Sequence, residues 1–196
     1  MTTMSAPPGK PAARVGRPRS DEVDARVVEA SLALLREGGP SSVNVQAVAA
    51  RAGVAKTSIY RRFDDRSELL RVAIGSVMRP PTKAPVAGIA ERLEWGLKQL
   101  RVLLGEILGP GGVAALMDNR EPDFTRMVRG LLRPYTTALA KLIDDDVEAG
   151  RLRREVDADA VVSLMVGAYL GELARRGRVG KGWERAFVDL LLHAVS

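Results

Sequence analysis

NVQAVAARAGVAKTSIYRRFDDRSELL, residues Asn44 to Leu70, is the stretch that decides the fold, because it predicts two short helices joined by a tight turn. Asn44 is a favourable N-cap, since its side-chain oxygen can accept a hydrogen bond from an amide of the first helical turn. Gly53 ends the first helix, because glycine adopts a positive φ without a steric penalty from Cβ. Between them, apolar residues recur at steps of three and four and give this helix one buried face: Val45, Val48, Ala49 and Ala52.

The second helix is predicted from about Ala55 to Phe63 and carries a basic, hydroxyl-rich surface. Ile59 and Phe63 stand four residues apart and face the core. Side chains of the types on the outer surface contact DNA phosphates and base edges, so the two helices predict a helix-turn-helix that binds DNA. The candidate DNA contacts are Asn44, Gln46, Lys56, Thr57, Ser58, Tyr60, Arg61, Arg62 and Arg66.

Three short motifs in this region resemble those of the TetR family of one-component transcription regulators. They are Ala52-Gly53-Val54 at the turn, Ser58-Ile59-Tyr60-Arg61-Arg62-Phe63 in the second helix, and Arg66-Ser67-Glu68-Leu69-Leu70 after it. The resemblance extends back to Gly16-Arg17-Pro18-Arg19 and to an amphipathic helix that Gly38-Gly39-Pro40 ends. It covers roughly the first third of the chain and implies a DNA-binding transcriptional regulator.

Three positions depart from the pattern of this family. A Ser or Thr commonly caps the second helix, whereas Ala55 cannot accept a hydrogen bond from an amide, and loss of such a cap costs about 0.5–2 kcal/mol. Arg62 stands where histidine is common, and Arg66 stands where lysine is usual. Both arginines keep or add positive charge, so only a DNA contact through residue 55 is placed in doubt.

The positive charge of the chain is concentrated in its first part. The 196 residues contain 30 Lys and Arg and 24 Asp and Glu, a net charge of +6. Residues 1–79 hold 13 basic and 8 acidic residues, a balance of +5, while residues 80–196 hold 17 and 16, a balance of +1. A concentrated positive field attracts polyanions and supplies the salt-dependent part of DNA affinity. The charge therefore supports double-stranded DNA as a partner of the N-terminal part.

The composition also limits the cellular compartments in which the protein is expected. The sequence contains no cysteine, which agrees with a reducing cytoplasm and excludes disulfides and thiolate chemistry. Residues 1–20 lack the apolar core of a signal peptide. The longest nearly apolar run, residues 160–171, has 12 residues, fewer than the roughly 20 that cross a bilayer. We therefore expect a cytoplasmic protein without a membrane partner.

The chain divides into three predicted parts. Residues 1–19 carry prolines and basic residues but no acidic residue, which predicts a disordered basic arm. Arg17 and Arg19 are candidates for contact with a narrow minor groove of DNA, the alternative being a plain solubilising tail. Residues 20–79 are the predicted DNA-binding domain, and residues 80–196 are the predicted effector-binding and dimerisation domain.

All periodic segments after residue 88 are helical, so the sequence predicts an all-α fold. The last helix of the DNA-binding domain is expected to start near residue 65 and to bury Leu69, Leu70, Ala73, Ile74 and Val77. Residues 82–88 contain a proline and a glycine and are a candidate hinge. Further helices are expected over 89–107, 113–119, 122–149, 158–176 and 181–195, with a break at Gly109-Pro110-Gly111-Gly112, a kink before Pro134 and a cap at Asp157.

The resemblance implies a homodimer formed by the last two helices and an effector cavity among the C-terminal helices. Two-fold symmetry suits a palindromic operator, because one short recognition helix contacts few base pairs. Candidate interface residues are Leu164, Ala168, Val188, Leu191 and Leu192. Candidate cavity residues are aromatic or flexible apolar side chains, which adapt to a small lipophilic ligand: Trp95, Met117, Phe124, Met127, Leu131, Tyr135, Met165 and Tyr169. A place in the core of one chain is the alternative for each of these residues.

Catalysis, a cofactor and a metal site have little support in the sequence. The single histidine, His193, has no evident nucleophile or acid near it in sequence. Asp144-Asp145-Asp146 and Glu148 cannot converge on one ion from a single helix, because adjacent helical residues point about 100° apart. We interpret them as a solvated face. Residues 109–112 lack the lysine and the Ser or Thr of a phosphate-binding loop.

Three functions follow in order of preference. The first is a ligand-responsive dimeric repressor, in which repression is implied by the family alone. The second is an architectural DNA-binding protein, which predicts binding to any duplex with a steep salt dependence. The third is a helical carrier or enzyme with a vestigial helix-turn-helix, which predicts no DNA binding even at low salt.

Overall fold

The fold is a string of helices with a small N-terminal group and a larger C-terminal group. The computed structural model describes residues 18–78 and 88–195, with side chains from residue 21 to residue 194. Every regular element in these residues is helical, which confirms the predicted all-α fold. The elements are α1 (Pro18–Gly38), η1 (Pro40–Ser42), α2 (Val45–Ala52), α3 (Lys56–Tyr60), α4 (Arg66–Val77), α5 (Ile89–Arg101), η2 (Val102–Leu108), α6 (Gly109–Asp118), α7 (Pro122–Glu148), α8 (Ala158–Arg176) and α9 (Trp183–Val195).

The helices of the N-terminal group begin where the sequence supplies caps. The side chain of Asn44 accepts a hydrogen bond from the Ala47 amide at 2.9 Å, and that of Asp65 accepts one from the Glu68 amide at 2.7 Å. Each cap satisfies a donor that the first helical turn leaves unpaired. Gly53 ends α2 with φ of 63°, as its position predicts. The stripe of α4 is buried up to Ile74, but Val77 is 40% exposed, so the predicted stripe is one turn too long.

The segment from Ile89 to Asp118 differs from the prediction. α5 passes directly into η2, a π-helical turn, and α6 begins at Gly109 rather than near Val113. Gly109 has φ of 61°, which changes the direction of the chain. Pro110 suits the first turn of a helix, because no amide donor is needed there. The glycine-rich stretch therefore starts a helix instead of separating two.

Glycines also allow α6 to approach the end of α1 closely. A Cβ at Gly111 would lie 2.3 Å from the Gly39 nitrogen and 2.7 Å from the Leu35 carbonyl oxygen. A Cβ at Gly109 would lie 2.7 Å from the Cβ of Arg36. Because the two atoms nearest to position 111 belong to the backbone, a side chain there would force the two helices apart.

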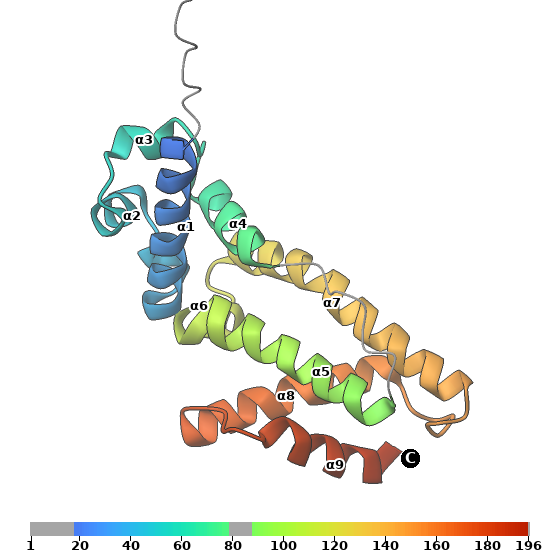
Figure 1. The fold of residues 1–196 in the computed structure, drawn as a ribbon. Helices are drawn as coiled ribbons and strands as arrows, with labels where there is room; N and C mark the ends of the chain where they lie inside the picture. Colours follow the sequence, from blue (N-terminus) through green and yellow to red (C-terminus); the bar gives the residue numbers. More distant parts are fainter. Residues whose placement is uncertain (1–17, 79–87, 196) are drawn as a thin grey trace, which may run out of the picture.

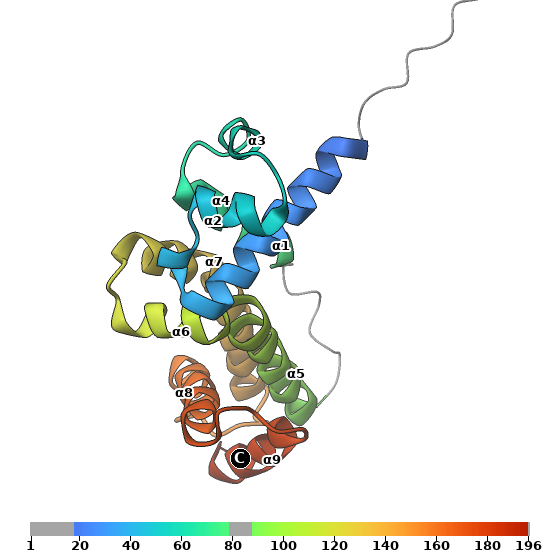
Figure 2. The same ribbon diagram turned by 90° about the vertical axis from the view of Figure 1, so that its left-hand side faces the viewer.

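Two clusters of buried residues hold the chain together. The first fills the space among α1, α2, α3 and α4 and continues into η2, α6 and α7. The second joins α5, α7, α8 and α9. The N-terminal group lies at one end of the molecule and α8 and α9 at the other, with α5 and α7 between them (Figure 1, Figure 2). The first core thus extends past residue 80, where the sequence predicts a domain boundary.

The C-terminal helices follow the predicted order. α7 runs through Pro134 without interruption, and the side chain of Asp157 caps α8 by accepting a hydrogen bond from the Ala160 amide at 2.9 Å. The candidate hinge over residues 82–88 lies outside the described residues except for Gly88, which is the N-cap of α5.

Asp146 contradicts the interpretation of the acidic run as a solvated face. Its side chain is fully buried and forms ion pairs with Arg92 of α5, at 2.8 Å, and with Arg151. Asp146 lies three residues after the buried Ile143 and therefore faces the core, whereas Asp145 pairs with Lys141 at the surface. The two guanidinium groups compensate the burial of the carboxylate and fix the end of α7 against α5.

The stretch Ile89–Asp118 is long and apolar enough to cross a membrane by length and composition alone. The core helix of a water-soluble protein meets the same criterion. Leu93 and Leu97 lie in the second core, and Leu104 and Leu108 lie in the first. Packing within the protein therefore accounts for these four leucines.

Gly111→Ala is expected to lower the free energy of unfolding by about 1–3 kcal/mol, the usual cost of overfilling a closely packed site. Gly75→Ala is the matched control, because no atom lies within 4 Å of an added Cβ at this exposed position of α4. Alanine at position 75 should stabilise the helix by about 0.5–1 kcal/mol. Chemical denaturation measures both changes, and equal stability of the two variants would contradict the close contact between α1 and α6.

An ion pair between Arg101 and Glu184 ties α5 to the start of α9. Arg101 Nε lies 2.5 Å from Glu184 Oε1, and the same guanidinium donates to the carbonyls of Val179 and Gly180 at 2.9 and 3.0 Å. Burial raises the pKa of the Glu184 carboxyl, but the hydrogen bond and charge of Arg101 outweigh burial and leave that pKa below its usual value of 4.5.

Stability at acid pH should therefore depend on Glu184. Because the carboxyl is more acidic in the folded chain than in the unfolded chain, its contribution is present above pH 4.5 and is lost as the pH falls through the folded pKa. Glu184→Gln should lower the Tm at neutral pH, and the difference from the wild type should shrink on acidification. Glu155→Gln, at an exposed carboxyl in the loop before α8, is the control and should leave the profile unchanged. A Tm difference that is constant with pH would refute the role of Glu184.

Candidate nucleic-acid interface and internal cavity

α2 and α3 form a helix-turn-helix that packs on α1 through buried side chains. Ile59 and Phe63 are buried beneath α3, as the spacing predicts. Ala55 is the N-cap of α3 and provides no side-chain hydrogen bond. α3 is a helix only over Lys56–Tyr60, shorter than the predicted 55–63, because the chain leaves the helix at Arg61.

Polar and basic side chains of this unit point away from the core. Lys56, Thr57, Tyr60 and Arg61 are exposed on α3 and its C-cap, and Tyr60 is 63% exposed. Within the described part of the chain, neither Lys56 nor Arg61 has an ion-pair partner, so their charges are available to an external anion. Gln46 is exposed at the start of α2. The elements that carry these residues, α2 and α3, lie at the end of the molecule opposite α8 and α9 (Figure 2).

Arg62 and Arg66 are engaged inside the protein. Arg62 forms an ion pair with Asp24 of α1 and donates a hydrogen bond to the carbonyl of Ser58, which is itself half-buried. Arg66 donates to the carbonyls of Pro40 and Val43, each at 3.0 Å, and pairs with Glu121 at 2.6 Å. Their positive charges are therefore already partnered, and both side chains hold helices together.

The remaining predicted contacts have other placements. The side-chain oxygen of Asn44 is occupied by the cap of α2, although the residue is exposed. Arg17 lies outside the described residues. Arg19 lies in the first turn of α1, and its side chain is outside the described part. Contact of these residues with DNA remains a prediction.

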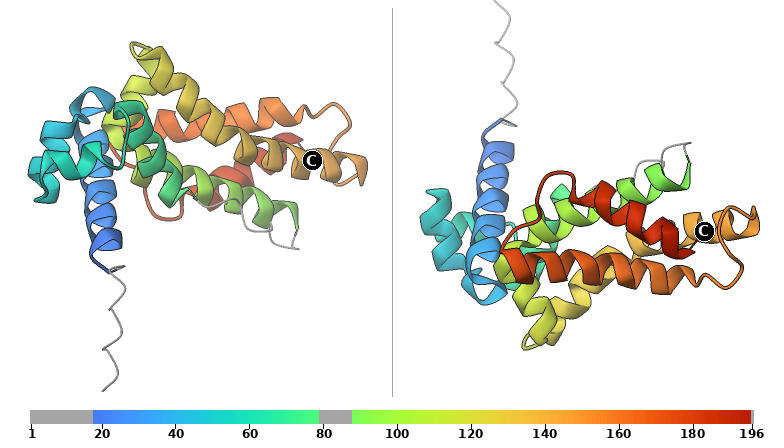
Figure 3. Two further views of the ribbon diagram at one scale, coloured as in Figure 1. Left: turned by 90° about the horizontal axis from the view of Figure 1, so that it is seen from above. Right: turned by 90° about the horizontal axis from the view of Figure 1, so that it is seen from below.

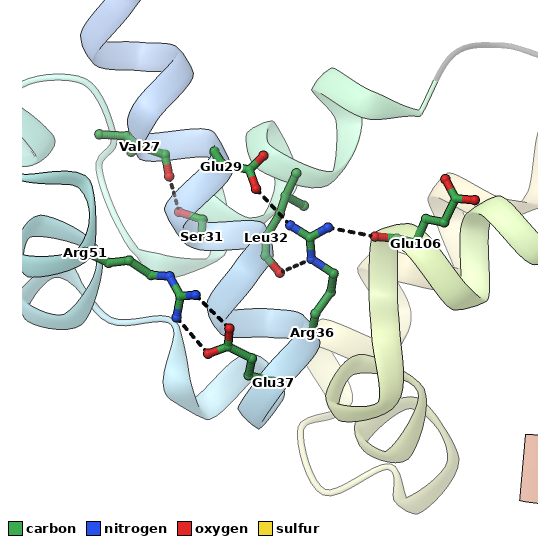
Figure 4. Close-up of polar contacts among 8 residues, drawn as sticks. All are labelled: Val27, Glu29, Ser31, Leu32, Arg36, Glu37, Arg51 and Glu106. Atoms are coloured by element: carbon green, nitrogen blue, oxygen red, sulfur yellow. Dashed lines mark hydrogen bonds and ion pairs between the residues drawn. The ribbon is translucent and has the colours of Figure 1, made fainter. Parts of the chain in front are cut away.

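Charged contacts fix α2 against α1 and α1 against the C-terminal group (Figure 4). Arg51 of α2 donates to both carboxylate oxygens of Glu37, at 2.7 and 2.6 Å, and this hydrogen bonding lowers the pKa of Glu37. Arg36 pairs with Glu29 at 3.1 Å and also donates to the backbone carbonyl of Glu106 in η2 at 3.2 Å. Together with the contact between Arg66 and Glu121, this places polar links on two sides of the boundary between the helix groups.

A cavity of about 140 Å³ lies among α5, η2, α6, α7 and α8. Four predicted residues line it: Trp95, Met117, Tyr135 and Met165. Burial raises the pKa of the Tyr135 phenol, so this group stays uncharged at neutral pH. The sequence did not distinguish the other lining residues from ordinary core residues: Gly96, Gln99, Leu100, Leu103, Leu104, Val113, Leu116, Leu132, Thr136, Leu139, Val162, Val166 and Leu170.

The other four predicted cavity residues lie elsewhere. Phe124 and Tyr169 are buried in the first core, and Met127 and Leu131 pack against it. For the three residues of α7, the difference arises from the face of the helix on which they lie. Phe124, Met127 and Leu131 form one stripe that faces the N-terminal group. The neighbouring stripe, with Leu132, Tyr135 and Leu139, faces the cavity.

Some of the predicted interface residues are accessible at the surface, and others are buried in the core. Leu164 is 52% exposed on α8, whereas Ala168 and Leu192 are half-buried. Val188 and Leu191 are each 2% exposed and pack in the second core of their own chain, not on an exposed face. Leu190, which is not among the predicted interface residues, is 69% exposed on α9. Seen from below, α8 and α9 lie on the same face with no other helix in front of them (Figure 3, right).

The helix-turn-helix and the overall fold both match known regulators. Residues 27–73 match the family model described as bacterial regulatory proteins, tetR family. The HTH-type transcriptional regulator YdeS of Bacillus subtilis (strain 168) is 24% identical over 185 residues, which span 91% of each chain.

Solved structures extend the likeness to the C-terminal helices. A protein from Rhodococcus sp. that is assigned to the TetR family aligns with a TM-score of 0.66 at 18% identity, over 89% of this chain and 98% of that one. The transcriptional regulator FadR from Bacillus subtilis, in complex with stearoyl-CoA, aligns with a TM-score of 0.59 at 16% identity, over 86% and 95% of the two chains. The helix-turn-helix region, residues 27–73, is therefore that of the TetR family of bacterial regulatory proteins, and the whole chain has the fold of solved proteins assigned to this family.

Proposed function

We propose that this regulator is a homodimeric repressor that binds a palindromic operator and is released by a small apolar ligand. The observation that carries the proposal is the combination of exposed basic side chains on α3 with an apolar cavity among the C-terminal helices, joined by close backbone packing between α1 and α6. Repression itself is taken from the family. The proposal places the protein in the cytoplasm, where it would meet its operator DNA.

DNA recognition is assigned to α3 and the start of α2. Lys56 and Thr57 stand at the N-terminal end of α3 and are proposed to contact base edges, whereas Tyr60 and Arg61 at its other end are proposed to contact phosphates. Gln46 and Asn44 are proposed to contact the DNA backbone from α2. A helix of five residues reaches few base pairs, so useful specificity requires a second copy.

The second copy is proposed to pack on α8 and α9. Exposed residues of α8 recur at helical spacing along one face, namely Leu164, Gly167 and Gly171. Apart from the backbone of α8 itself, no atom of the described residues lies within 4 Å of an added Cβ at either glycine. Leu190 adds a large apolar side chain on α9. A two-fold axis through this face would bring the same residues of two chains together as an isologous interface.

Ligand release is proposed to act through α6. Leu116 and Met117 of α6 line the cavity, while Gly109 and Gly111 of the same helix contact α1. A ligand that moves α6 would therefore change the angle of the N-terminal group, which couples ligand affinity to operator affinity. FadR, which is solved with stearoyl-CoA, is an example of a protein with this fold and a bound ligand.

Selection of bound sequences from random duplex DNA by the purified protein tests the proposal. A palindromic site with half-site centres about one helical turn of DNA apart, or a multiple of it, would support a specific dimeric regulator. Binding without a motif would indicate an architectural protein. No binding at low salt would leave a carrier or an enzyme.

Arg61→Ala is expected to weaken binding to every duplex and to reduce the slope of log affinity against log salt by about 1, because one phosphate contact is lost. Arg178→Ala removes the same charge from the exposed loop between α8 and α9 and should leave both quantities unchanged. Electrophoretic mobility shifts over a range of salt concentrations measure the slopes, and equal slopes for the two variants would contradict the assignment of Arg61.

Leu190→Glu is expected to convert the dimer to a monomer, because a charge would be buried at the proposed interface without a partner. Val77→Glu places the same charge on another exposed apolar residue, at the end of α4, and should leave the dimer intact. Sedimentation velocity reports the masses. A Leu190→Glu protein that remains dimeric would require a different interface.

A further inference from the structure

The volume of the cavity limits the size of its ligand. Ligand pockets commonly measure about 300–1,000 Å³, whereas this cavity measures about 140 Å³. An apolar cavity of about 150 Å³ holds a molecule of the size of benzene. A long acyl chain is several times larger and would require the helices to separate.

The lining of the cavity limits the charge of its ligand. Among the described residues, none of the side chains that line it is charged. Lys98, on α5, is engaged with Glu94 at 2.8 Å, and Arg133 of α7 is exposed to solvent outside the lining. A charged group in this cavity would therefore lose its hydration without gaining an ion-pair partner, which is strongly unfavourable.

Two side chains of α5 offer hydrogen bonds to a ligand. Gln99 and Trp95 line the cavity one helical turn apart, and neither side chain makes a hydrogen bond to another described residue. The Thr136 hydroxyl, in contrast, donates to the carbonyl of Arg133 at 3.1 Å. A single oxygen or nitrogen on the ligand would satisfy Gln99, which can both donate and accept.

We propose that the cavity binds a compact, uncharged molecule of about one ring, with one hydrogen-bonding group that contacts Gln99. Simple aromatic alcohols and phenols represent this class. Carboxylates, amines and acyl thioesters of coenzyme A are excluded from it. The inference rests on the proposed ligand response but concerns only what the cavity accepts.

Trp95 provides a direct readout of binding. The chain contains two tryptophans, and Trp183 is stacked on Phe187 away from the cavity lining. In a Trp183→Phe protein, fluorescence therefore reports Trp95 alone. Titration with benzyl alcohol should give a saturable change, and benzoate and benzylammonium, which have the same ring, should bind at least about tenfold more weakly. Octanoyl-CoA should give no saturable change at Trp95.

Variants separate the cavity from other parts of the surface. Val166→Phe places a ring in the cavity and should abolish the response, while Val102→Phe adds the same ring at an exposed position of η2 and should not. Gln99→Leu should weaken binding of benzyl alcohol but not of toluene, which has no group for the amide. Equal losses for the two ligands would refute the role of Gln99.

Other results of the titrations would overturn the proposed class of ligand. Tighter binding of benzoate or octanoyl-CoA than of benzyl alcohol would overturn the proposed class of ligand. So would a result in which benzyl alcohol, benzoate, benzylammonium and octanoyl-CoA all fail to bind up to their solubility limits. Because the fluorescence assay contains no DNA, its result is independent of the repressor proposal. Ligand binding without a change in operator affinity would refute ligand release and leave the class of ligand established.

Discussion

The backbone contact between the end of α1 and the start of α6 is the constraint on which the rest of the arrangement depends. Gly109 approaches Arg36, and Gly111 approaches Leu35 and Gly39, so closely that an added Cβ at either glycine would clash with α1 or the residue after it. The bond from Arg36 to Glu106 and the ion pair between Arg66 and Glu121 lie beside this contact. The N-terminal helices therefore follow α6 as a rigid group, and closely packed helices of this kind change position in discrete steps.

Features that depend on neighbours in sequence were predictable. The caps at Asn44 and Asp157 and the left-handed turn at Gly53 each require a residue type at one position, and all three are present in the structure. The inward direction of Ile59 and Phe63 follows from helical spacing alone. The all-α fold was likewise predictable, because every segment had a helical period and capping signals separated the segments.

Features that depend on distant residues were not predictable. Arg66 resembles a phosphate contact in sequence, but its partner Glu121 lies 55 positions away. The side chains of α7 form two adjacent apolar stripes, and only the packing of α5 and α8 decides that the stripe with Tyr135 lines a cavity. Val188 and Leu191 face the core although Leu190 between them faces outward, because the rotation of α9 is set by its contact with α5.

The π-helical turn η2 fixes the number of residues between the cavity and the contact with α1. A π-helix holds more residues in each turn than an α-helix. If the same seven residues, Val102–Leu108, wound as an α-helix instead, each residue would turn the chain further and the following helix would leave this turn in a different direction. The glycines of α6 would then face away from α1, although every lining residue and every contact residue would still be present. The winding of this turn therefore positions α6 as directly as do the side chains that contact it.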